Sequence, residues 1–231
     1  METALSRLEL LIGSENTATL KAKKVVIFGI GGVGGYVCEA LVRSGIEHFI
    51  LVDNDVVNIT NLNRQIIATY KTLGQYKVEA MKDRILDINP SCDVTLIKKF
   101  MLKEDIESFS FDGVDYIIDA IDTITSKIAL VEMANKNNIR IISSMGTGNK
   151  MNPAMLEVSD IYKTSVCPLA KVMRHELKKR NINNLKVVYS KEEPLKVSSS
   201  SERKVTPGSN SFVPSTAGLI IASEVIKDLI K

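Results

Sequence analysis

Two cations and a set of amides follow a glycine-rich turn in the first third of the chain. The turn reads VVIFGIGGVGG over residues 25–35, and the segment DNDVVNITNLNRQ follows over residues 53–65. Arg64 can bind a phosphate through two parallel hydrogen bonds, and Lys77 adds a point charge. These residue types suit the phosphates of a nucleotide. Taken singly, each is also compatible with a solvated surface position.

The glycines match the spacing of a nucleotide-binding loop. Gly29, Gly31 and Gly34 fit G-x-G-x-x-G between an expected strand at 24–29 and an expected helix at 32–45. The first glycine permits a tight turn, the second lets the backbone approach phosphate, and the third allows close packing of helix on strand. The helix N-terminus then offers N–H groups to phosphate oxygens. A tight turn without a ligand is the alternative.

Asp53 ends the next expected strand, 48–53, about 20 residues after the turn. A carboxylate there can accept a hydrogen bond from a ribose hydroxyl, which supports an adenosine nucleotide. That placement alone does not separate NAD from ATP. The cations Arg64 and Lys77 favour a triphosphate over a nicotinamide.

A second acid, Asp122, stands at the carboxyl end of an expected strand at 114–122. Doubly wound sheets bind their ligands at this edge. A carboxylate there can hold Mg²⁺ that bridges the phosphates. Capping the following helix is the other interpretation.

Strand-like and helix-like patterns alternate along the first two thirds of the chain. This alternation predicts an α/β, Rossmann-like doubly wound fold with a mainly parallel sheet. The expected strands are 24–29, 48–53, 93–100, 114–122 and 139–146, and the expected helices are 32–45, 73–89 and one from 123 to about 137.

The pattern changes after Gly146. Strands at 154–161 and 185–190 and helices at 168–181 and 217–231 predict an α+β extension on the same sheet, and the polar segment 196–210 predicts a mobile loop. We expect a single domain, 1–231, with an N-terminal helical arm (1–23), a nucleotide-binding core (24–146) and a substrate-side extension (147–231).

Composition narrows the functional class. The 231 residues are 45% hydrophobic and 25% charged with a net charge of +3, which is typical of a globular protein and does not by itself indicate nucleic-acid binding. The three cysteines form no CxxC pair, which argues against a zinc ribbon and favours a reduced, cytoplasmic setting. No segment resembles a signal peptide or a membrane span.

The motifs GIGGVGG, LVDND, TNLNRQ, LGQYKVEAM and DAIDT, in this order, resemble the superfamily of ubiquitin-activating enzymes and bacterial sulfur-carrier adenylyltransferases. In that superfamily an acid binds ribose, an Asn/Arg/Lys set binds the ATP phosphates, and a later Asp holds Mg²⁺. The resemblance implies catalytic roles for Arg64, Lys77 and Asp122, of which Asp122 also binds the metal, and for Arg7 near the N-terminus. With the glycine motif, the implied ATP-binding set is Gly29, Gly31, Gly32, Gly34, Asp53, Asp55, Asn61, Asn63, Arg64, Gln65 and Lys77.

The N-terminal SRLELLIG is also similar to the superfamily, where an arginine matching Arg7 reaches the ATP of the neighbouring subunit. This implies a homodimer with composite sites. An exposed arginine on an amphipathic helix is the alternative.

Later segments resemble one branch, the bacterial tRNA threonylcarbamoyladenosine dehydratases. They are DAIDTITSK, GTGNKMNPAMLEVSDIYKT and CPLAKVMRHELKKRNI. The resemblance implies ATP-dependent cyclisation of the threonylcarbamoyl group on the adenosine beside the tRNA anticodon, through a carboxyl-adenylate. Three alternatives stay open: an adenylyltransferase for a ubiquitin-like sulfur carrier, an NAD-dependent oxidoreductase, and a nucleotide-sensing module without catalysis.

A tRNA substrate requires a surface that binds phosphates. The helix at 168–181 carries a local basic patch, although a solvated polar face is the alternative. The cations expected to bind tRNA are Lys171, Arg174, Lys178, Lys179 and Arg180.

Cys167 precedes this helix, and its thiol could form a thioester or simply pack. The sequence leaves open a monovalent cation near 146–170 and a cysteine-desulfurase or sulfur-acceptor partner.

Overall fold

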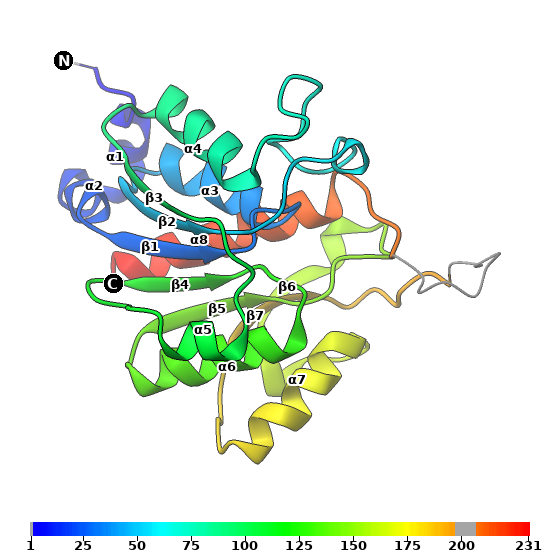
Figure 1. Ribbon diagram of the computed structural model, residues 1–231. Coiled ribbons are helices and arrows are strands. Elements are labelled where there is room, and N and C mark those ends of the chain that lie inside the picture. Colours follow the sequence, from blue (N-terminus) through cyan, green and yellow to red (C-terminus); the bar gives the residue numbers. More distant parts are fainter. Residues whose placement is uncertain (1, 197–206) are drawn as a thin grey trace.

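Seven strands form one sheet in the computed structural model, which describes residues 2–196 and 207–231 (Figure 1). The order is β3-β2-β1-β4-β5-β7-β6, and all neighbours pair in parallel except β6 and β7. The predicted fold class, including an extension on the same sheet, is therefore confirmed. The strands are β1 (Lys24–Phe28), β2 (His48–Val52), β3 (Asp93–Ile97), β4 (Tyr116–Asp119), β5 (Arg140–Ser144), β6 (Leu156–Asp160) and β7 (Lys186–Ser190).

The extent of burial distinguishes the central strands of the sheet from its edge strands. Val25–Phe28 of β1 and the whole of β4 are buried, as expected for parallel strands covered on both faces. The edge strands β3 and β6 are only partly buried and carry polar residues such as Asp93 and Glu157.

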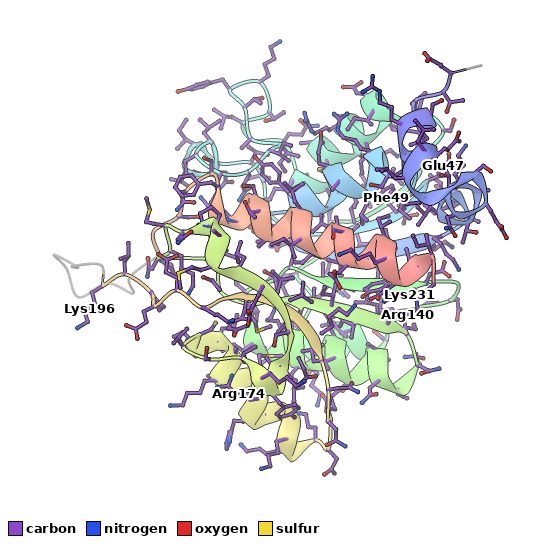
Figure 2. All side chains as sticks on the ribbon, turned by 180° about the vertical axis from the view of Figure 1, so that it is seen from behind. Glu47, Phe49, Arg140, Arg174, Lys196 and Lys231 are labelled. Carbon is purple, nitrogen blue, oxygen red and sulfur yellow. The ribbon has the colours of Figure 1, made fainter. Side chains whose placement is uncertain are left out.

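Helices cover both faces of the sheet. One face packs against α3, α4 and α8, and the other packs against α5, α6 and α7 (Figures 1 and 2). The helices are α1 (Ser6–Ile12), α2 (Ser14–Lys21), α3 (Gly34–Arg43), α4 (Lys77–Ile88), α5 (Lys103–Glu107), α6 (Ile124–Lys136), α7 (Pro168–Lys179) and α8 (Val213–Leu229). Among the helices described, none is both long and apolar enough to cross a membrane.

Two glycines allow backbones to meet at the start of α3. A Cβ on Gly34 would lie 1.8 Å from the carbonyl oxygen of Gly29, so this helix begins directly against the turn. A Cβ on Gly218 would lie 2.5 Å from the carbonyl oxygen of Val33, so α8 also rests on the first turn of α3. The turn, α3 and α8 therefore pack as one unit.

Several element boundaries differ from the predictions. The helix expected at 73–89 begins at Lys77, because Gly74 has φ +83° and Tyr76 pairs with Val56 in an isolated antiparallel bridge. The strand expected at 114–122 covers only Tyr116–Asp119, because its ladder with β1 ends at Phe28. Asp122 therefore lies in the loop beyond the strand.

Two other element boundaries differ as well. The strand expected at 93–100 ends at Ile97, because β2, its partner, ends at Val52. The last helix begins at Val213 rather than 217, where the Asn210 carboxamide accepts the Phe212 and Val213 N–H groups. Of the predicted mobile loop, 196–210, residues 197–206 lie outside the described residues.

We expect Gly218→Ala to destabilise the protein, because the new Cβ would enter the backbone of α3. Overpacking of this kind costs about 2 kcal/mol, which lowers the melting temperature by roughly 4–8 °C in a chain of this size. Calorimetry measures the shift. Ser223→Ala at an exposed position of the same helix is the control, and a Gly218→Ala variant as stable as this control would contradict the packing argument.

Candidate nucleotide-binding site

A cleft of about 510 Å³ opens at the carboxyl edge of the sheet. It lies beyond the ends of β1, β2 and β4, where doubly wound folds bind their ligands. Most of the predicted ATP-binding residues line it, namely Gly29, Gly31, Gly32, Asp53, Asp55, Asn61, Arg64, Gln65 and Lys77, together with Asp122.

Two predicted residues lie just behind the cleft wall. Gly34 packs against Gly29, in agreement with its predicted packing role. The Asn63 amide donates to the carbonyl of Ser209, which does line the cleft.

The Asp53 carboxylate holds the glycine turn against the end of β2. One oxygen accepts the Ile30 N–H at 2.7 Å, and the other accepts the Asp55 N–H at 2.8 Å. Each carboxylate oxygen can accept more than one hydrogen bond, so Asp53 can also accept a hydrogen bond from a ribose hydroxyl.

The glycine turn presents several free backbone donors. Among the described residues, the N–H groups of 31–34 find no acceptor, whereas those of Ile30 and Gly35 are bonded. Within residues 2–196 and 207–231, no side chain caps the N-terminus of α3. Unused N–H groups at the start of a helix form a binding site for anions, and phosphate is the anion this geometry suits.

Lys77 is the first residue of α4 and is 6% exposed. Its ammonium lies 2.6 Å from the carboxylate of Asp55, and its backbone N–H donates to the Asp55 carbonyl at 2.9 Å. Asp55 therefore fixes the position of Lys77, and it does so from an exposed side chain. A cation held in this way is positioned before any ligand arrives.

Arg64 follows a short 3₁₀ helix, Ile59–Asn61. Its guanidinium donates to the Thr60 carbonyl at 2.9 Å and to the Asn63 amide oxygen at 3.0 Å. Neither partner is charged, so the arginine keeps its full charge for an anion.

The two amides that complete this wall are buried. Asn61 accepts the Asn58 N–H at 2.9 Å, which fastens the 3₁₀ helix. The Gln65 carboxamide oxygen is buried without a hydrogen-bond partner among the described residues, and its amide nitrogen lies beside Gly31. A buried polar atom without a partner requires an explanation, and a ligand or water in the cleft supplies one.

Asp122 is exposed at the cleft, and its side chain contacts no hydrogen-bond or ion-pair partner in the described chain. No group of three or more metal-ligating residues occurs among the residues described. A single carboxylate beside a phosphate site fits Mg²⁺, which is usually held by one or two carboxylates together with substrate phosphates.

The sequence reasoning missed part of the cleft wall. Lys99, Phe100 and Met101 line the cleft, as do Thr147 and Pro214. The first three lie just beyond the end of β3, at the carboxyl end of the strand expected at 93–100, and that position would have indicated them. Thr147 and Pro214 reach the cleft only through tertiary packing.

A buried ion pair was also missed. Asp119 and Lys127 are both completely buried and lie 2.9 Å apart. Lys127 directly precedes the apolar run 128–131 of α6, and a lysine beside such a run indicates a buried partner.

Arg7 does not reach the cleft of its own chain. It is exposed on α1, which lies with α2 at the opposite end of the molecule from the segment that ends at Lys196 (Figure 2). Leu5 packs against Gly45, just beyond the end of α3 that is remote from the glycine turn. Any contact between Arg7 and a nucleotide therefore needs a second chain.

The basic patch on α7 is partly neutralised. Arg174 donates to the Thr164 carbonyl at 3.0 Å, and Arg180 pairs with Glu132 and Glu176. Lys179 also pairs with Glu176, and the hydrogen bonds from Lys179 and Arg180 lower the pKa of Glu176 to about 2.

Lys171 and Lys178 of the patch are exposed and form no ion pair with the residues described. Arg174 lies on the same helix (Figure 2). Because the Thr164 partner of Arg174 is uncharged, three of the five predicted tRNA-binding cations have no anionic partner among the residues described.

Cys167 is only 2% exposed, at the N-cap of α7, with its thiol beside Gly146. A thiol buried in this way favours packing over thioester chemistry. Cys38 and Cys92 are buried as well, in agreement with packing roles.

The chain is similar to a known protein family and to several curated proteins. A family model described as "ThiF family" matches residues 5–231. The tRNA threonylcarbamoyladenosine dehydratase of Bacillus subtilis is 45% identical over 239 residues, which cover 98% of this chain and 94% of that protein. The Escherichia coli dehydratase is 40% identical over 154 residues, which cover 67% of this chain and 58% of that protein.

A solved structure of the Escherichia coli dehydratase in complex with ATP superposes with a TM-score of 0.90 at 31% identity, covering 98% of this chain and 93% of that one. The likeness therefore extends over the sheet and over the C-terminal extension. Because the family model matches residues 5–231 and the Bacillus subtilis relative matches nearly from end to end, the chain belongs to the ThiF family.

Proposed function

We propose that the protein uses ATP to cyclise the threonylcarbamoyl group on the adenosine beside the tRNA anticodon. The observation that carries this proposal is the cleft, where the free N–H groups of 31–34, Arg64, Lys77 and Asp122 surround one space. An NAD site has no need of two cations and a solvent-facing carboxylate there. The similarity to the Bacillus subtilis dehydratase supplies the substrate.

The first chemical step forms a carboxyl-adenylate. The carboxylate of the modification attacks the α-phosphorus of ATP, the bond to the bridging oxygen breaks, and pyrophosphate leaves with the electron pair. Arg64 and Lys77 neutralise the charge that develops on the phosphate oxygens. Mg²⁺ held by Asp122 adds to this neutralisation when bound.

The second step closes the ring. A nucleophilic atom of the same modification attacks the activated acyl carbon, AMP leaves, and a proton is released, so the net loss is one water. Both groups belong to one side chain of the tRNA, so proximity supplies most of the rate and no protein nucleophile is required. The burial of Cys167 agrees with this mechanism.

The active unit that we propose is a homodimer. Arg7 lies far from its own cleft, whereas Leu10 and Leu11 on the same helix are 87% and 82% exposed. Adjacent exposed leucines of this kind mark an interaction surface. A second copy bound through α1 would bury them and carry Arg7 toward the partner's cleft.

The tRNA lies across α7 in this proposal. The helix begins beside Gly146, whose neighbour Thr147 lines the cleft, so a strand of RNA bound along α7 leads to the ATP. Lys171 and Lys178 are exposed for its phosphates, and Arg174 keeps its charge because its Thr164 partner is neutral. The free state of all three cysteines supports a cytoplasmic location.

Incubation with ATP, Mg²⁺ and tRNA bearing the open modification should remove one water from the modified nucleoside and release AMP. Mass spectrometry of digested tRNA and phosphate analysis measure the two products. Lys77→Met should lower the rate on the order of 100-fold, because a positioned transition-state contact is lost. Release of ADP and phosphate would contradict the mechanism, and unchanged tRNA would contradict the substrate.

Mixing two inactive variants tests the composite site. Arg7→Ala and Lys77→Met chains, refolded together, should recover about one quarter of the wild-type activity, because half of a random mixture is heterodimers with one intact site each. Each variant alone is the control. A mixture no more active than its components would show that Arg7 acts within its own chain or not at all.

Substitutions that make α7 either less or more positively charged test whether this helix binds tRNA. Lys171→Glu with Lys178→Glu should weaken tRNA binding and reduce the slope of log affinity against log salt by about two. Glu176→Gln should tighten binding, because Lys179 and Arg180 lose their acidic partner. Filter binding over a salt series gives both values. Wild-type affinity in both variants would place the tRNA elsewhere.

A further inference from the structure

The buried Asp119–Lys127 pair has no part in the proposed chemistry. Asp119 is the last residue of β4, and Lys127 lies on the first turns of α6. The ammonium is 2.9 Å from each carboxylate oxygen, and both side chains are completely buried. Taking two charges out of water is expensive, and an apolar pair of similar volume is often at least as stable. Stability alone therefore does not explain the pair.

The hydrogen bonds of Lys127 show which backbone groups the ion pair holds in place. The Lys127 ammonium also donates to the Ile121 carbonyl at 3.1 Å and to the Ser144 carbonyl at 2.9 Å. The Ile121 N–H donates in turn to the Asp119 carboxylate at 3.3 Å. Ile121 is thus fastened through both its N–H and its carbonyl, and the next residue is Asp122.

The preceding residue is held independently. The Ala120 N–H donates to the Phe28 carbonyl at 2.9 Å, which continues the ladder between β4 and β1. The glycine turn packs against the backbone of this same residue and against the Ile121 side chain. Lys127 acts on the backbone of the loop beyond Ala120, whereas the N–H groups of Gly29 and Ile30 in the turn donate to Val52 and Asp53.

The polar environment of the pair is not fully satisfied. The hydroxyl of Ser143, the neighbour of Asp119 across β4 and β5, is buried without a hydrogen-bond partner among the described residues. Burying two charges beside an unpaired polar group costs free energy. An ion pair that is present despite this cost has a purpose other than packing.

We propose that Lys127 is a positioning residue that sets the Asp122 carboxylate for the divalent cation that accompanies ATP. It does so by fixing the carbonyl of Ile121 to the end of β5. This inference rests on the proposed function, because it assumes that Asp122 holds the cation. Partners that orient a metal ligand typically change metal affinity by about 10–100-fold when they are lost.

The test compares two paired substitutions. Asp119→Leu with Lys127→Met removes the donor to Ile121, and Asp119→Asn with Lys127→Gln removes the charges but leaves a donor. Mn²⁺ binding to the protein with ATP, followed by electron paramagnetic resonance, should weaken about tenfold in the first pair and stay near wild type in the second. Binding of ATP in chelator, followed by calorimetry, should be unchanged in both, and Asp122→Asn shows the effect of losing the carboxylate itself.

Wild-type Mn²⁺ affinity in the folded apolar pair would overturn the inference. An equal loss of ATP binding in chelator would also overturn it, because that result indicates general packing. If the apolar pair does not fold, Asp119→Asn with Lys127→Met removes the same donor with less change of shape and is judged by the same criteria. Absence of Mn²⁺-dependent ATP binding in the unaltered protein would overturn the proposed function, and the inference with it.

Discussion

The contact between the glycine turn and α3 is the constraint on which the rest of the site depends. Gly34 lies so close to the Gly29 carbonyl that no side chain fits between them. This approach directs the start of α3, with its unused N–H groups, toward the space beyond β1. Asp53 then fastens the turn to β2, and α8 closes over the helix at Gly218.

Charges around the cleft are held in different ways. Lys77 is fixed by an anion, Arg64 by neutral oxygens, and Asp122 by no side-chain contact among the residues described. The buried charge of Lys127 acts on the backbone instead, so the loop that carries Asp122 is ordered while its carboxylate stays available. Rigid backbone with unengaged charged groups is the arrangement that electrostatic catalysis requires.

The sequence predicted the sheet and most of the cleft because both follow from local rules. Apolar runs and the glycine spacing specify strand, turn and helix, and the ends of parallel strands meet at one edge, which places Asp53 near Asp122. Helix ends were less predictable, since the start of α4 depends on the bridge between Val56 and Tyr76. Thr147 and Pro214 reach the cleft through contacts between distant segments, which no local pattern encodes. The pairing of Glu176 with Lys179 and Arg180 needed side-chain geometry.

The Asp55–Lys77 contact also bears on how a nucleotide leaves. The lysine is paired with Asp55, so an incoming ligand must compete with this carboxylate for its charge. A triphosphate carries enough negative charge to do so, and the released Asp55 side chain is more than half exposed and returns to water at little cost. In the proposed reaction a monophosphate would compete less well, because it carries less negative charge, and Asp55 would pair with the lysine again once pyrophosphate has gone. The same contact would then order the cleft for ATP and favour departure of AMP.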